Sequence, residues 1–125
     1  MNTASEPTSV RLSAKANTIL AQMKEDGYLA EMSDGYRLGI ALALSQAITP
    51  PELPPDSKTF IAVSGLDPEQ EIATAIRALV SLEGQSVYRY AERLADWGVM
   101  HMQERFKGGQ LDVAALIGNL AKAGA

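Results

Sequence analysis

The chain has 125 residues, 46% hydrophobic and 21% charged, a balance that predicts one folded domain and excludes wholesale disorder. It contains one histidine and no cysteine, which excludes disulfides, thiolate metal sites and cysteine nucleophiles. The net charge is −4, so overall charge does not support DNA binding, which would need a local basic patch.

The first residues, MNTASEPTSV, contain no basic region followed by an apolar core, so we expect no signal peptide. The lack of cysteine suits a reducing compartment, and we expect a cytoplasmic protein that does not enter a membrane. Residues 1–7 are mostly small and polar and predict a flexible tail.

Thr8–Ser13 alternates apolar and polar side chains, which predicts a short β-strand. Its apolar face would carry Val10 and Leu12. Its other face would carry Ser9, Arg11 and Ser13.

Two helices follow. Ala14–Glu25 has apolar residues spaced at i, i+3, i+4 and i+7, Ser13 is placed to cap its start, and Gly27 should end it. Gly35–Ile48 is an apolar run rich in alanine and leucine, which favours a helix over a strand, with Ser33 or Asp34 as its N-cap. The run is too short to cross a bilayer, so we expect a buried core helix.

This central helix would carry a ridge of small residues at every fourth position: Gly35, Gly39, Ala43 and Ala47. Such a ridge lets another backbone approach closely. Two interpretations remain open, namely packing against another helix of the same chain and a homodimer seam.

Residues 49–58 contain four prolines and predict a stiff connector. Thr59–Val63 is either a short strand or an extended apolar segment on the core, and we favour the segment. The next helix should start with Asp67 as N-cap, Pro68 in its first turn and Gln70 reaching back. Its apolar stripe would be Ile72, Ala75, Ile76 and Leu79, and Gly84 would stop it.

Ser86–Phe106 predicts the longest helix, with one broad apolar face. The opposite, solvated face would carry Arg89, Glu92, Arg93, Asp96, Gln103 and Lys107. The arginine–carboxylate spacings predict surface ion pairs, so we read Glu92 and Asp96 as solvated partners of arginines and not as catalysts. His101 would be a hydrogen-bonded residue at the edge of the apolar face. A last helix should run from Leu111 to Lys122.

We therefore expect a mainly α protein, a single compact domain of about five helices with one short N-terminal strand. A strand-helix-helix unit (8–48) would be joined by the connector (49–58) to a three-helix C-terminal part (59–122) packed on it. The residues show no pattern typical of a catalytic, metal or cofactor site, which predicts a protein that is not an enzyme.

Residues 8–48 resemble a ribbon-helix-helix module, because the strand TSVRLS is followed by helix Ala14–Glu25 and a second helix. In that family two chains pair their strands into a ribbon that enters the DNA major groove. The resemblance implies a dimeric DNA-binding regulator that reads bases through Ser9, Arg11 and Ser13, with 33–36 near phosphate.

The stretches MSDGYRLGIALAL and VYRYAERLADWGVMHMQERFKGG together resemble small accessory proteins of bacterial DNA phosphorothioation and related defence systems. That resemblance implies a non-enzymatic adaptor with a stable protein partner in a DNA-modification assembly. Of the two functions we expect the adaptor first, with the ribbon-helix-helix regulator as the alternative.

Overall fold

A computed structural model describes residues 6–107, and the helix predicted at Leu111–Lys122 lies outside them. Within this range the chain is mainly α with an N-terminal strand, as the sequence predicts, and it contains five helices and one two-stranded antiparallel sheet. No helix of the described part is long and apolar enough to span a membrane.

The first unit contains β1 (Ser9–Leu12), α1 (Ala14–Glu25) and α2 (Met32–Ser45). The predicted bounds of α1 are confirmed, and its cap is local, since the Ser13 hydroxyl accepts a hydrogen bond from the Ala16 N–H at 3.2 Å. The strand and the cap each depend on residues that are close in sequence. The start of this unit can therefore be predicted from the sequence.

The bounds predicted for α2 were wrong at both ends. The helix begins at Met32 because Glu31 is the N-cap and forms a capping box with Asp34, in place of a cap at Ser33 or Asp34 itself. It ends at Ser45, and Ala47 lies beyond it with φ of +53°, a left-handed conformation that breaks the helix before Ile48.

Lys58–Ala62 forms a second strand, β2, so our preference for an extended segment on the core was wrong. β2 pairs antiparallel with β1, with Val10 opposite Ile61 and Arg11 opposite Thr59. The register shifts between Val10 and Arg11, as a β-bulge does, and this interrupts the simple alternation that would have marked β2 in the sequence.

A single turn, α3 (Val63–Leu66), follows β2 directly and was not predicted. α4 (Glu71–Leu79) then starts later than predicted, after Gln70 in a left-handed conformation with φ of +58°. The helix also ends before Gly84, and its last residue, Leu79, is 40% exposed, so it does not belong to the buried stripe.

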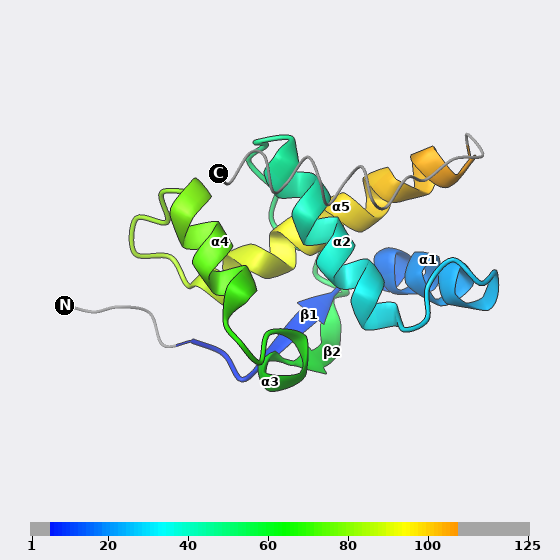
Figure 1. Cartoon of the computed structure of the whole chain (residues 1–125), viewed down its shortest axis with the longest axis horizontal. Helices are drawn as coiled ribbons and strands as arrows, with labels where there is room; N and C mark the ends of the chain where they lie inside the picture. The colour runs from blue at the N-terminus through cyan, green and yellow to red at the C-terminus, as the bar shows by residue number, and fades with distance from the viewer. Residues whose placement is uncertain (1–5, 108–125) are drawn as a thin grey trace.

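α5 (Val87–Lys107) confirms the long predicted helix and crosses α2 at the centre of the fold (Figure 1). At the crossing a Cβ on Gly98 would collide with the backbone of Gly39, so the two helices touch through their glycines. The ribbon of β1 and β2 lies against this pair, with Val10 and Leu12 buried in the shared core.

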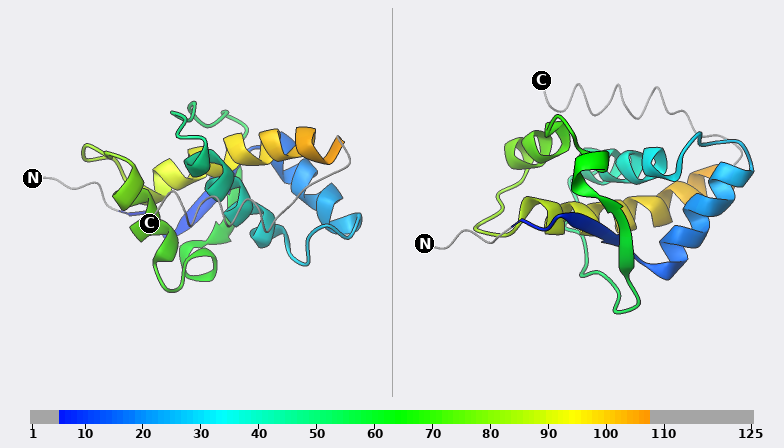
Figure 2. Two further views of the ribbon diagram at one scale, coloured as in Figure 1. Left: turned by 45° about the horizontal axis from the view of Figure 1, so that its top comes forward. Right: turned by 90° about the horizontal axis from the view of Figure 1, so that it is seen from below.

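The order strand, helix, helix occurs twice in the described part of the chain. β1, α1 and α2 form one strand-helix-helix unit, and β2, α4 and α5 form a second, with α3 inserted. The two strands pair with each other, the two long helices cross, and α1 and α4 lie at opposite ends of the molecule in each view (Figures 1 and 2). The resemblance to a ribbon-helix-helix module implied a ribbon shared by two chains. In the structure both strands of the ribbon come from one chain.

Candidate functional site

The carboxylates of Glu92 and Asp96 on α5 are buried, 1% and 8% exposed, which corrects their predicted place on a solvated face. They lie along the edge of β1 that does not face β2. Glu92 Oε2 accepts the Arg11 N–H at 2.8 Å, and Asp96 Oδ2 accepts the Ser13 N–H at 2.9 Å. These two side chains of α5 thus accept the N–H groups that a third strand would otherwise bind at this edge.

Glu92 also binds two arginine side chains, one from each unit. Its carboxylate accepts hydrogen bonds from Arg11 Nε at 3.1 Å and Arg11 Nη2 at 2.9 Å. It accepts a further one from Arg89 Nη1 at 2.8 Å. These hydrogen bonds with Glu92 raise the pKa of Arg11 above its ordinary value, although burial acts in the opposite direction.

Tyr36 on α2 completes the edge of β1. Its hydroxyl donates to the Arg11 carbonyl at 2.9 Å, and its ring stacks on Phe60 of β2 with centroids 5.0 Å apart. Burial raises the pKa of Tyr36 well above the usual value, so the phenol stays a hydrogen-bond donor. Nothing in the local sequence distinguishes this tyrosine, because its partners are set by tertiary contacts.

The three positions predicted to read bases have different environments. Ser13 is 1% exposed and its hydroxyl caps α1, so it does not face outward. Arg11 is held by Glu92 but keeps 44% of its side chain exposed, and Ser9 is half-buried. Ser9 and Arg11 share the outer face of the ribbon with their strand partners, Ala62 and Thr59.

The N-terminus of α2, predicted to approach phosphate, is taken up by the protein's own acidic side chains. The carboxylate of Glu31 accepts the N–H of the third helical residue, Asp34, and the carboxylate of Asp34 accepts the N–H of Glu31. Negative charge at this end of the helix repels a further anion.

The predicted ridge of small residues packs inside the chain at three of its four positions. A Cβ on Gly35 would meet Leu20 and Leu29, and one on Gly39 would meet the Ala95 carbonyl at 2.8 Å. Ala43 is buried as well. These contacts correspond to the helix-packing interpretation, and Ala47 lies outside the helix and is exposed.

A second polar cluster lies where α3, α4 and α5 meet. The buried carboxylate of Asp67 accepts the N–H groups of Ile72 and Ala73 at 2.9 and 3.0 Å and the Tyr88 hydroxyl at 2.8 Å. Burial and the hydrogen bond to Asp67 raise the pKa of Tyr88 to about 12. The prediction of Asp67 as N-cap and of Pro68 in the first turn was wrong, because Gln70 is the N-cap. Asp67 still accepts N–H groups of the first turn of α4, from three residues before the N-cap.

Glu6 belongs to this cluster too, which corrects its assignment to a flexible tail. Its carboxylate accepts hydrogen bonds from the Val87 and Tyr88 N–H groups, both at 3.2 Å, and from the Ser86 hydroxyl. It therefore occupies the N-terminus of α5. Two open clefts of about 450 and 510 Å³ flank it, and both are lined by Glu6 and Arg77.

His101 and Arg93 both have structural partners. His101 Nδ1 lies 2.8 Å from the Trp97 carbonyl and its ring stacks on Trp97, so the predicted boundary histidine is confirmed. Arg93 binds the carbonyls of Pro50 and Pro51 and so ties the proline connector to α5; no ion pair with Asp96 forms.

Within residues 6–107 no group of three or more histidine, cysteine or acidic side chains is placed to hold a metal ion. Comparisons with protein-family models, with curated proteins and with solved structures find no match to this chain.

Proposed function

We propose that this chain is a non-enzymatic adaptor that binds a protein partner through the outer face of the β1–β2 ribbon. The observation that carries the proposal is that one chain forms the whole ribbon. Its two strands pair with each other, and side chains of α5 occupy the remaining edge of β1. One face is buried against the helices, and the other is presented to solvent on a rigid support.

Three buried carboxylates and the exposed Glu6 support a binding role because each is used to hold the fold. Glu92 and Asp96 accept N–H groups of β1, Asp67 accepts N–H groups of α4, and Glu6 accepts those of α5. A general acid or base needs a carboxyl free to exchange its proton with substrate. These four groups act as backbone caps. The resemblance noted above would place the partner in a DNA-modification or defence assembly.

A photo-crosslinking amino acid at Thr59 tests this role in the native host. Thr59 is exposed on the outer face of the ribbon, and Ala21, exposed on α1, provides the matched control. We expect one defined crosslinked protein from position 59 and none from position 21. The same crosslinked bands from both positions, or none from either, would exclude the ribbon as the contact surface.

A second candidate is DNA contact by the same ribbon, favoured by the paired strands beneath two crossing helices. Because the ribbon is made in cis, such a protein would bind DNA without first forming a dimer. A gel shift at low salt checks this candidate. Binding that falls steeply with salt and is weakened by Arg11→Ala would support it, whereas no shift at low salt would remove it.

A further inference from the structure

Arg11 and Arg89 present two guanidinium groups side by side next to the ribbon. Both donate to the same atom, Glu92 Oε2, at 3.1 Å and 2.8 Å. Glu92 is 1% exposed, whereas the two arginine side chains are 44% and 47% exposed. A buried acceptor thus fixes two cations at the surface.

Each guanidinium retains donors that no residue in the range 6–107 uses. Arg11 Nη1 and the Nε and Nη2 of Arg89 have no hydrogen-bond partner among the described residues. The cluster contains two positive charges and one buried negative charge, so it keeps a net charge of +1. Fixed, partly exposed arginine donors are suited to binding a carboxylate or phosphate group.

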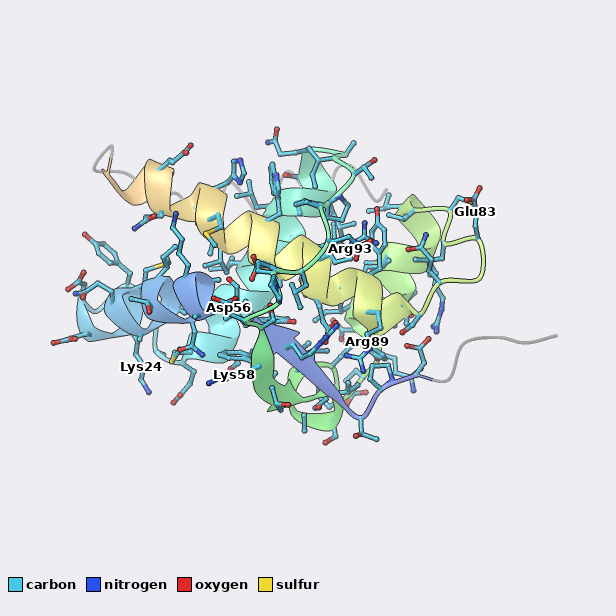
Figure 3. The ribbon with its side chains drawn as sticks, turned by 180° about the vertical axis from the view of Figure 1, so that it is seen from behind. Lys24, Asp56, Lys58, Glu83, Arg89 and Arg93 are labelled. Carbon is cyan, nitrogen blue, oxygen red and sulfur yellow. The ribbon has the colours of Figure 1, made fainter. Side chains whose placement is uncertain are left out.

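The surroundings favour an anionic partner as well. Figure 3 shows Lys58 at the start of β2 and Arg89 on α5 on the two sides of the ribbon, with Arg93 further along α5. Lys58 is exposed, whereas Asp96 on α5 is buried and holds the Ser13 N–H. Asp56 in the connector also lies near the start of β2 in the same view.

The geometry points to Arg11 and Arg89 as an oxyanion site that binds a carboxylate side chain in an acidic segment of the protein partner. This assignment rests on the proposed adaptor function and adds the chemistry of its partner. Charge complementarity favours a protein over a nucleic acid. A duplex requires several phosphate contacts, the chain carries a net charge of −4, and the N-termini of α2 and α5 are filled by its own carboxylates.

A synthetic hexaglutamate peptide is the probe, titrated into ¹⁵N-labelled full-length protein while the arginine Nε–H signals are followed. We expect the Arg11 and Arg89 signals to shift together. Arg89→Gln should weaken binding roughly tenfold, because it removes charge-assisted donors but leaves the Arg11–Glu92 pair in place. Arg77→Gln removes the same charge from an exposed position on α4 and should leave the affinity within about twofold of the wild type.

Equal weakening in both variants would show non-specific attraction and overturn the site, as would the absence of binding to the wild type at millimolar peptide. A duplex DNA that binds more tightly than the peptide and is lost in Arg89→Gln would overturn the protein partner in favour of nucleic acid. If the Thr59 crosslink persists in Arg89→Gln while peptide binding is unchanged, the oxyanion site fails and the adaptor function stands.

Discussion

The two strand-helix-helix units share an order of elements but start their helices in different ways. In the first unit the caps are local, since Ser13 caps α1 and Glu31 forms a capping box with Asp34 at α2. In the second, Asp67 accepts the N–H of Ile72 in α4 from five residues upstream. The first turn of α5 is capped both by the local Ser86 hydroxyl and by Glu6, which lies 81 residues away from Val87.

This difference means that the first turn of α5 depends in part on the N-terminal segment. The Val87 and Tyr88 N–H groups of α5 are satisfied when Glu6 of the N-terminal segment lies beside them. The edge of the first strand is satisfied when α5 supplies Glu92 and Asp96. Unsatisfied N–H groups at a buried helix start or strand edge are costly. The two units should therefore unfold as one cooperative body.

The largest effect should come from breaking the contact between the units at the crossing of α2 and α5. Gly98→Ala would place a Cβ on the backbone of Gly39, which cannot move aside, so we expect a loss of at least about 3 kcal/mol in unfolding free energy. Urea denaturation measures this loss. Gly65→Ala is the control, because its Cβ would meet Ile61 at an ordinary 3.6 Å and should change little.

A smaller loss should follow when the carboxylate that links the units is neutralised. Glu92→Gln removes the charge opposite Arg11 and Arg89, and we expect a loss of about 2–3 kcal/mol, moderated because both arginines can be solvated. Glu104→Gln, on an exposed part of α5, should be nearly neutral in the same denaturation experiment. Equal stability of Glu92→Gln and wild type would contradict the structural role of Glu92.

A cap variant from each unit compares local and long-range capping directly. Ser13→Ala and Glu6→Gln should each cost about 1 kcal/mol. Hydrogen exchange should then separate them: loss of the Glu6 cap should speed exchange at the Val87 and Tyr88 amides and leave α1 unchanged. Faster exchange in α1 of the Glu6 variant would argue against this assignment.

The last prediction concerns the alkaline pH range and Tyr88. Its pKa is raised from 10.0 to about 12, so the folded protein holds the phenol proton that the unfolded chain releases. This contribution is complete below about pH 10 and is lost as pH rises to about 12. Tyr88→Phe should therefore show a shallower alkaline loss of stability, and the buried Tyr36 should account for part of what remains. Parallel curves for variant and wild type would refute the shift.

The features that could be predicted from the sequence are those that depend on residues close to one another in the chain. The inward Val10 and Leu12, both ends of α1 with its Ser13 cap, and the long helix α5 are all confirmed. Helical periodicity, however, assigns Glu92 and Asp96 to the polar face of α5. These two carboxylates are buried because they pack against the edge of β1, which lies about 80 residues away in the sequence. The strand β2 was missed for the same reason, because its partner is β1 and its register contains a bulge.

The most direct test of the fold is whether the ribbon is formed within one chain. In a sample mixing ¹³C-labelled and unlabelled protein, isotope-filtered nuclear Overhauser effects separate contacts between chains from contacts within one. We expect the Val10–Ile61 contact in the intramolecular spectrum and no contact from β1 in the intermolecular one. An intermolecular contact between Val10 and Val10 of a second chain would show a ribbon shared by two chains and would contradict the structure.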